Sequence, residues 1–243
     1  VLAGTQGHVN HKKTDRVLEV ARRNVLPVVL FAEGGGGRPG DTDAPVVAGL
    51  DVMSFASFAS LSGLVPLVGI ASGYCFAGNA ALLGCCDVVI ATEDSNIGMA
   101  GPAMIEGGGL GVVAPTEIGP IGVQSKNGVV DVRVADDVEA VAVAKQYLSY
   151  FQGSQTSWQE PDVESLADVV PVERVRVYEV RRAIEGIADC GSVLELRREF
   201  GVGVVTSLAR ITGRPVGIVA NNPVHLGGAD RKSTRLESSH TDI

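Results

Sequence analysis

The sequence predicts an α/β layered fold whose strands pair mostly in parallel. Short apolar runs typical of strands alternate along the chain with segments whose apolar residues recur at helical spacing. Residues 88–91 (VVIA) are apolar throughout, as expected of a strand that is covered on both faces of a sheet. The 243 residues, 45% of them hydrophobic, suffice for one large core or two small ones.

The expected elements of the first half keep this alternation. Apolar residues at helical spacing predict a helix over residues 14–23, and an apolar run predicts a buried strand over residues 27–31. The further elements are a strand end at 1–3, a glycine-rich loop at 33–40, helices at 50–61 and 79–84, and strands at 65–72 and 87–92. We therefore expect the chain to begin inside a domain.

The second half changes character twice. A glycine-rich excursion at 98–111 leads to a strand at 127–134 and to a helix that ends at Phe151 and that Asp136 or Asp137 can cap. The polar, acidic residues 153–171 predict a linker, which a helix at 178–187 follows. Strands at 202–211 and 216–220 flank the sequence TGRP, which predicts a hairpin. Because little chain follows this hairpin, we expect a truncated second sheet.

The last fourteen residues, DRKSTRLESSHTDI at 230–243, break with the preceding pattern. They resemble a read-through translation of a common sequencing adaptor, from which Glu237 departs. The alternative is an ordinary disordered basic tail. We expect a non-native tail and leave these residues out of the functional argument.

Composition excludes several classes of function. The net charge of −8 and the pI of about 5.0 argue against a general nucleic-acid binder. No run reaches the roughly 18 apolar residues of a membrane span, and the N-terminus lacks the pattern of a signal peptide. The four cysteines form no CxxC pair, so we expect no metal site, and Cys85 and Cys86 are expected to be small buried hydrophobes. A reducing cytoplasm is the simplest compartment.

The turn GYCFAGNAA, residues 73–81, carries the chemistry that the sequence suggests. It connects an apolar strand to a helix and is built from small residues, so a ligand can approach the backbone closely. Converging backbone N–H groups can hold an oxyanion, and a helix that begins there adds a partial positive charge. A tight turn without a ligand is the alternative that the local pattern leaves open.

The longer segment GYCFAGNAALLGCCDVVIAT resembles the oxyanion-hole segment of the crotonase superfamily, whose members bind acyl-CoA thioesters. Within it, the chain resembles the carboxyltransferase subunits of biotin-dependent acyl-CoA carboxylases. Other segments that carry this resemblance are VLAGTQGHVNH at the start, the loop at 33–40, IGVQSKNGVVDVRVADDVEAVAVAKQYL, and GSVLELRREFGVGVVTSLARITGRPVGIVANNP.

The resemblance implies a crotonase-like (ClpP/crotonase) fold of layered spiral sheets with surrounding helices. The chain would supply the N-terminal half and the start of a second repeat. The implied domains are an N-terminal carboxyltransferase domain at 1–152 whose start is missing, a linker at 153–177, a truncated C-terminal domain at 178–229 that begins with a helix and a hairpin, and the tail at 230–243.

The resemblance also implies a reaction. Carboxybiotin, held on a carrier domain, releases CO2, its ureido nitrogen takes the α-proton of an acyl-CoA, and the enolate attacks the CO2. Backbone N–H groups would stabilise the enolate oxygen. Ala77 and Gly78 match the family's oxyanion pair. The implied substrate-binding residues are Gly36, Gly37, Arg38, Gly73 and Asn79.

Biotin carboxylase and biotin carboxyl carrier domains are the implied partners, together with a neighbouring subunit of a homo-oligomer that completes the site. Acetyl-, propionyl- and longer acyl-CoA all remain open as substrates. By itself the chain is expected to be inactive. It departs from the family at Ala77, where glycine is usual. Its loop GGGGRPGDTD resembles that of some large fused carboxylases.

Two other functions remain. A non-catalytic acyl-CoA-binding or assembly module would have the same turn. An enoyl-CoA hydratase of the superfamily would need a glutamate three residues beyond the oxyanion glycine, where this chain has Ala81. A peptidase using Ser72 lacks a histidine in a recognisable context.

Further patterns receive structural interpretations. The GxGxxG match at Gly35, Gly37 and Gly40 lacks the helix that a dinucleotide site needs. His8 and His11 have no additional ligand cluster and are expected in a solvated turn and at a helix start. The acidic cluster of Asp131, Asp136, Asp137 and Glu139 is expected to form a solvated face and a helix cap, and Glu106 is expected at the surface.

Overall fold

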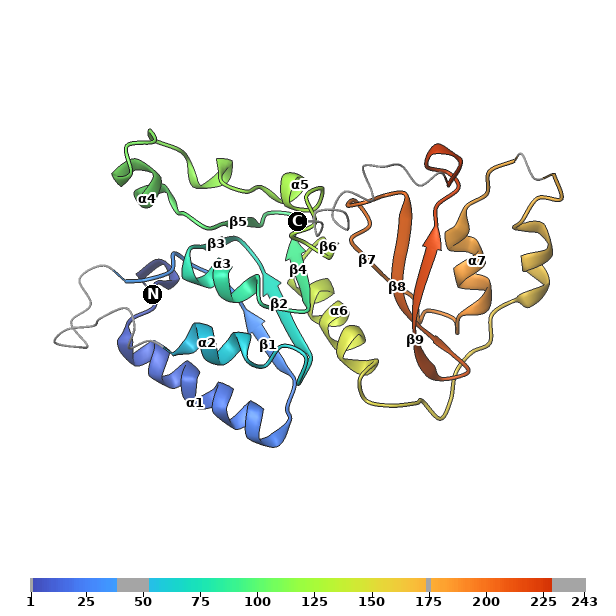
Figure 1. The fold of residues 1–243 in the computed structure, drawn as a ribbon, viewed down its shortest axis with the longest axis horizontal. Coiled ribbons are helices and arrows are strands. Elements are labelled where there is room, and N and C mark those ends of the chain that lie inside the picture. Colours follow the sequence, from blue (N-terminus) through green and yellow to red (C-terminus); the bar gives the residue numbers. More distant parts are fainter. Residues whose placement is uncertain (1, 39–52, 174–175, 229–243) are drawn as a thin grey trace, which may run out of the picture. The chain divides into compact units, whose positions relative to one another are not determined.

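The computed structural model describes residues 2–38, 53–173 and 176–228 (Figure 1). The chain divides into two compact units, Val1–Leu148 and Ser149–Ile243, which we describe separately. The predicted first domain ends at residue 152, close to this division. The assignment of the ranges to an N-terminal domain, a linker and a C-terminal domain stays a prediction. The predicted tail at 230–243 lies outside the described residues.

The first unit contains most of the elements. Its helices are α1 (His8–Asn24), α2 (Ser54–Ala59), α3 (Gly78–Leu83), α4 (Pro102–Gly107), α5 (Ile121–Gln124) and α6 (Asp137–Ser149), which ends at the first residue of the second unit. Its strands are β1 (Val28–Phe31), β2 (Leu67–Ala71), β3 (Tyr74–Phe76), β4 (Val88–Thr92), β5 (Asn96–Gly98) and β6 (Val132–Val134). Short 3-10 helices lie at Leu2–Gly4 and Pro115–Glu117.

The strands of this unit form two parallel sheets. The larger sheet has the order β1-β2-β4-β6, and the smaller one pairs β3 with β5. The central strands β2 and β4 are buried at every residue, as the apolar run at 88–91 predicts. The predicted α/β class with parallel pairing is confirmed.

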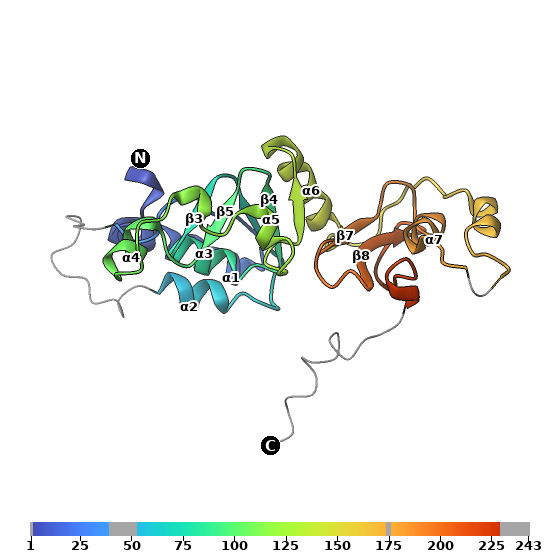
Figure 2. The ribbon, with the colours of Figure 1, turned by 90° about the horizontal axis from the view of Figure 1, so that it is seen from above.

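Helices α1, α2 and α3 cover one side of this sheet. Leu18 of α1, Phe58 of α2 and Leu82 of α3 pack in one cluster with Leu67 of β2. Helix α2 lies beside both α1 and α3, as Figures 1 and 2 show from two directions. This packing places the start of α3 next to the start of α2.

Several predictions for this unit are wrong in detail. The described part of 1–3 lies in a 3-10 helix rather than a strand. Strand β1 is only half buried, with Phe31 62% exposed, because it lies at the edge of the described sheet. The strand expected at 127–134 is limited to β6, and no sequence pattern predicted β3, β5 or α4. Residues 50–52 of the helix expected at 50–61, and Gly40, lie outside the described residues.

Side-chain placement corrects two further expectations. Asp131 is buried rather than solvated, and its Oδ2 accepts a hydrogen bond of 2.8 Å from the N–H of Val89. Cys85 and Cys86 are half-buried, whereas Cys75 is buried. The expected cap of α6 is confirmed, since Oδ1 of Asp136 accepts a bond of 2.9 Å from the N–H of Glu139.

The second unit is built on a three-stranded antiparallel sheet, in the order β7 (Leu194–Leu196), β8 (Val204–Ile211), β9 (Arg214–Asn221). Helix α7 (Val180–Ile187) packs Ile184 against Val205 of this sheet. Two 3-10 helices, Val163–Asp168 and Leu226–Gly228, complete the described elements. The predicted hairpin is confirmed, with Ile211 paired to Arg214 across a two-residue turn.

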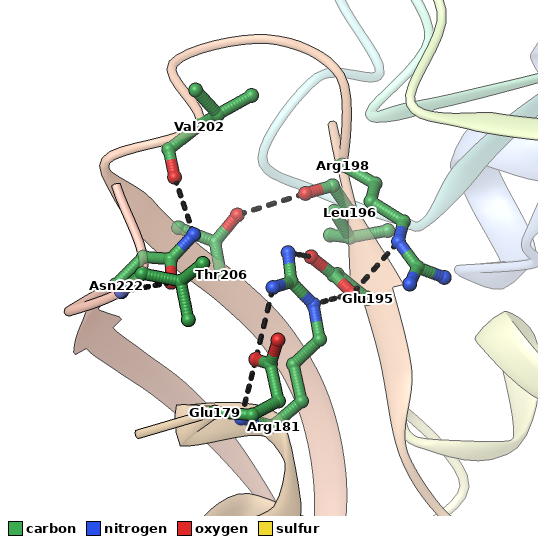
Figure 3. A network of polar contacts seen from close by, with 9 residues as sticks. Glu179, Arg181, Glu195, Leu196, Arg198, Val202, Thr206 and Asn222 are labelled. Atoms are coloured by element: carbon green, nitrogen blue, oxygen red, sulfur yellow. Dashed lines mark hydrogen bonds and ion pairs between the residues drawn. The ribbon is translucent and has the colours of Figure 1, made fainter. Parts of the chain in front are cut away.

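An ion pair between charged side chains joins α7 to strand β7 of the sheet (Figure 3). The Arg181 guanidinium binds the Glu195 carboxylate through two hydrogen bonds, of 2.8 and 2.6 Å, and also pairs with Glu179. Nearby, Nδ2 of Asn222 donates to the carbonyl of Val202 at 2.8 Å, and Oγ1 of Thr206 donates to the carbonyl of Leu196. The ion pair of Arg181 with Glu195 therefore connects α7 to β7, while the other two bonds hold side chains of β8 and of the segment after β9 to the backbone.

Within the described parts of the chain, no helix is long and apolar enough to cross a membrane. In the same residues, no three His, Cys, Asp or Glu side chains gather as a metal site.

Candidate functional site

The turn at residues 73–81 lies where β3 passes into α3, and its backbone is strained. Ala77 adopts φ 51° and ψ −119°, a conformation that favours glycine, and directly precedes the first residue of α3. Its N–H donates to the carbonyl of Gly98 at 3.0 Å. The amide of Ala77, one of the two predicted oxyanion donors, is therefore already bonded to the chain itself.

Gly78, the other predicted donor, differs in this respect. Among the described residues, its N–H has no hydrogen-bond partner. Gly36, with φ +83°, lies directly beside it: a Cβ on Gly36 would stand 2.7 Å from Cβ of Ala77 and 3.0 Å from N of Gly78. Glycine at position 36 thus keeps the space next to the Gly78 nitrogen free.

Main-chain hydrogen bonds hold the glycine loop, residues 33–38, in this position. On one side it follows β3, since the N–H of Gly34 donates to the carbonyl of Tyr74 at 2.6 Å and the carbonyl of Gly34 accepts from Phe76 at 2.9 Å. On the other side, the N–H of Gln6 donates to the carbonyl of Gly36 at 2.7 Å. The loop is therefore clamped between β3 and the N-terminal segment.

Asn79 belongs to the same cluster, but its side chain is 3% exposed. Its Oδ1 accepts from Nε2 of Gln6 at 2.5 Å, and its Nδ2 donates to the carbonyl of Glu33 at 2.9 Å. Both ends of the side-chain amide are therefore bonded to the chain, so the side chain is not free to bind a substrate in this arrangement.

The other predicted substrate-binding residues lie at the edge of this cluster or outside it. Gly37 is exposed next to Gly36, and a Cβ there would meet nothing within 4 Å. Arg38 turns toward the N-terminal segment, where Nη2 donates to the carbonyl of Thr5 at 3.1 Å. Gly73 lies at the other end of β3, and its carbonyl accepts from the N–H of Asn96 at 2.9 Å.

The structure adds a residue that sequence reasoning missed. A Cβ on Gly78 would lie 3.2 Å from Cζ of Phe55, so the ring of this α2 residue lies over the turn. Phe55 is 39% exposed and also contacts the His11 ring. No local signal in the sequence indicates this contact, because it depends on how α2 packs beside α3.

The turn offers little acid–base chemistry. Residues 73–81 contain no carboxylate and no imidazole. Burial, and secondarily the charge of Glu33, raises the pKa of the Cys75 thiol to about 12, so this group stays protonated at neutral pH. Glu106 is exposed on α4, as expected, whereas His11 is buried rather than solvated, because α1 packs against α2 and places its Nδ1 3.1 Å from the Ser54 hydroxyl. The arrangement suits electrostatic stabilisation by the backbone.

Comparison with known proteins gives a consistent result. The family model described as "Carboxyl transferase domain" matches residues 1–234. The methylmalonyl-CoA carboxyltransferase 12S subunit of Propionibacterium freudenreichii subsp. shermanii is 30% identical over 242 residues, which cover 94% of this chain and 45% of the relative. The chain spans about half the length of the curated relatives it matches.

Solved structures agree in fold. A single-chain, multi-domain long-chain acyl-CoA carboxylase superposes with a TM-score of 0.90 at 64% identity, over 94% of this chain and 23% of that protein. The hexameric transcarboxylase 12S, solved with methylmalonyl-CoA bound, gives a TM-score of 0.79 at 29% identity, over 94% of this chain and 45% of that protein. The predicted resemblance and the predicted fold are confirmed.

Proposed function

Because the chain belongs to the carboxyl transferase domain family, we propose that it is the acyl-CoA half of the carboxyltransferase in a biotin-dependent acyl-CoA carboxylase. In this proposal the enzyme moves a carboxyl group from carboxybiotin to the α-carbon of an acyl-CoA. The observation that carries the proposal is the amide of Gly78, which has no partner among the described residues and which Gly36 leaves accessible.

The oxygen of the acyl-CoA thioester would accept a hydrogen bond from the N–H of Gly78. This oxygen becomes negative when the α-proton leaves, so a donor fixed at that point stabilises the enolate more than the substrate. Carboxybiotin would supply the CO2 and the nitrogen that takes the proton. A turn without side-chain bases fits that division, because this chain need only bind and polarise the thioester.

The predicted pairing of Ala77 and Gly78 is modified in this proposal. The N–H of Ala77 is bonded to Gly98, so the role of Ala77 is to direct the N–H of Gly78 toward the glycine loop. We assign the second donor to Gly36 or Gly37, whose N–H groups also have no partner among the described residues. Gly73 and Arg38 support the loop and the strand beside it.

For the substrate, we propose a long-chain acyl-CoA, and for the architecture, a single polypeptide that includes biotin carboxylase and carrier domains. Both rest on the 64% identity to a single-chain long-chain acyl-CoA carboxylase. We also retain the predicted homo-oligomer, which the hexameric 12S relative supports. The predicted cytoplasmic location stays part of the proposal.

The test compares two glycines with similar φ angles in the full-length protein. Gly36 has φ +83° and Gly63 has φ +75°, but a Cβ on Gly63 would meet nothing within 4 Å. Gly36→Ala should therefore close the space beside Gly78, whereas Gly63→Ala adds only backbone strain. Gly78→Pro removes the amide hydrogen itself. Incorporation of labelled bicarbonate into acetyl-, propionyl- and palmitoyl-CoA, with and without avidin, measures the activity.

We expect avidin-sensitive carboxylation that is fastest with palmitoyl-CoA. Gly36→Ala and Gly78→Pro should lower kcat by about 100-fold or more, the usual effect of losing an oxyanion donor. Gly63→Ala should keep its kcat. Normal turnover by a folded Gly78→Pro protein would overturn the assignment of the donor. Binding of acyl-CoA without any carboxylation by the intact protein would favour the acyl-CoA-binding module instead.

A further inference from the structure

We propose that Gln6 and Asn79 are positioning residues for the oxyanion site, and that the hydrogen bond between their side chains keeps the Gly78 amide aligned with the substrate oxygen. This inference rests on the function proposed above. It changes the interpretation of Asn79, which the sequence suggested as a substrate-binding residue.

The geometry joins three distant segments at one point. Asn79 is the second residue of α3, and its side chain reaches Gln6, 73 residues away, and Glu33, 46 residues away. The backbone of Gln6 is bonded to the glycine loop twice: its N–H donates to Gly36 at 2.7 Å, and its carbonyl accepts from Arg38 at 2.9 Å. Gln6 therefore connects the loop to the helix that carries the oxyanion donor.

Burial makes this link costly to break. Asn79 is 3% exposed, so loss of the Gln6 side chain would leave its Oδ1 without a partner among the described residues. In the described part of the chain, the N-cap residue of α3, Ala77, makes no side-chain cap hydrogen bond, so the side chain of Asn79 is the polar support of this helix start. An unusual conformation such as that of Ala77 persists only where its surroundings hold it.

The position of Asn79 in the sequence makes the link relevant to catalysis. Asn79 follows Gly78 directly, so a shift of its main chain also shifts the N–H of Gly78. At the same time the link sets the distance between Gly78 and Gly36. A displacement of 1 Å at a reacting group can cost about 100-fold in rate, so loss of the link should be evident in kcat as well as in stability.

The experiment is a double-mutant cycle in the full-length carboxylase with Gln6→Ala, Asn79→Ala and the double variant. Asn222→Ala is the matched control: Asn222 is 7% exposed, and its Nδ2 likewise donates to a backbone carbonyl, that of Val202, but in the other unit. For each variant we would measure kcat and KM for palmitoyl-CoA, Tm, and hydrogen–deuterium exchange of peptides covering residues 33–38 and 76–83.

We expect each single variant to lower kcat by about 10- to 100-fold with little change in KM, since alignment rather than binding is lost. The double variant should be no slower than the slower single variant, because both break the same link. Exchange should rise in both peptides together. Asn222→Ala should lower Tm to a similar extent and leave kcat and both peptides unchanged.

Two outcomes would overturn the proposal: effects on kcat that multiply in the double variant, or a kcat that stays normal while Tm falls as in Asn222→Ala. Gln6→Ala keeps the test decisive if Asn79→Ala does not fold, because Gln6 is only half-buried. If the wild-type protein fails to carboxylate any acyl-CoA, the proposed function fails. The exchange data then still show whether the link holds the loop to the turn, and an unchanged exchange pattern rejects it.

Discussion

Two turns of the chain share a local pattern, a non-glycine residue with positive φ followed by glycine. In the first unit the pair is Ala77 and Gly78, with φ 51° at Ala77, and in the second it is Thr212 and Gly213, with φ 49° and 76°. The turns differ in what their amides bind. Both N–H groups of the second turn donate to the Asp189 carboxylate, at 2.8 and 2.7 Å, whereas that of Gly78 has no partner among the described residues.

The two turns differ in whether the groups that hold the backbone also bind its N–H groups. Two buried side chains hold the turn around Thr212. One is the carboxylate of Asp189, and the other is the guanidinium of Arg210, which donates to the carbonyls of Gly153 and Gly213. Around Ala77, the support comes from backbone bonds and from Asn79, the residue that follows Gly78. Such support leaves a strong donor available to a ligand, while the carboxylate of Asp189 consumes two.

Among the changes that test this comparison, removal of the Asp189 side chain should lower stability the most. Asp189→Ala leaves the amides of Thr212 and Gly213 without their acceptor, the Gly213 amide in a buried position, and we expect the second unit to lose about 3 kcal/mol of stability. Hydrogen–deuterium exchange should rise across β8 and β9 and stay unchanged in β2 and β4. Asp189→Asn, which keeps one carbonyl oxygen, should lose less. Unchanged exchange at Thr212 would show that the turn does not depend on the carboxylate.

A smaller change in stability should distinguish glycine substitutions in the parallel sheet from those in the antiparallel sheet. Gly69 of the parallel sheet and Gly217 of the antiparallel sheet are both strand glycines. A Cβ on Gly69 would lie 2.5 Å from Cδ1 of Leu83 and 2.9 Å from Sγ of Cys86, whereas one on Gly217 would meet nothing within 4 Å. Gly69→Ala should therefore cost about 1–3 kcal/mol through overpacking. Gly217→Ala should stabilise the protein by roughly 0.5 kcal/mol, because alanine loses less entropy in a strand.

Urea unfolding of both variants measures the two changes. The comparison fails if Gly69→Ala is neutral, since the space between β2 and α3 would then not be filled. It also fails if Gly217→Ala destabilises as much as Gly69→Ala, because the antiparallel sheet would then be packed on that face as well.

Local sequence patterns were enough to predict the regular parts of the fold. Helix α1, the strands β2 and β4, the capped helix α6 and the β8–β9 hairpin all have clear periodicity or a two-residue turn. Strands β3 and β5 have three residues each and lie in glycine-rich sequence, where no period can be recognised. The edge position of β1 depends on strand order, which its own sequence does not contain.

The site shows the same limit. The turn at residues 73–81 and its resemblance to a known family located the candidate site. The bond from Ala77 to Gly98, the ring of Phe55 over Gly78 and the link from Gln6 to Asn79 could not be predicted, because each joins segments at least 21 residues apart. Polar residues such as Asn79 and Asp131 are usually exposed, so their burial becomes evident only when their partners are known.

The smallest expected effect concerns pH and the packing of α1 against α2 in the first unit. Ser54, 0% exposed, donates to Oδ1 of Asp15 at 2.6 Å and lies 3.1 Å from Nδ1 of His11. Burial lowers the pKa of His11 below its ordinary value of 6.5; Asp15 opposes this shift and His8 adds to it. As the pH falls, the imidazole of His11 therefore takes up its proton at a higher pH in the unfolded chain than in the folded one. The fold should consequently lose stability as the pH falls below 6.5.

His11→Asn can test this effect, because the asparagine side chain keeps a donor for the Ser54 hydroxyl but does not titrate in this range. We expect the free energy of unfolding of the wild type to fall more steeply between pH 7 and about pH 5 than that of His11→Asn. Exchange in α1 and α2 should follow this difference, and exchange in β8 and β9 should not. Parallel pH profiles for the two proteins would show that the buried imidazole does not control this contact, and the stability of the α1–α2 packing would then depend on its apolar residues alone.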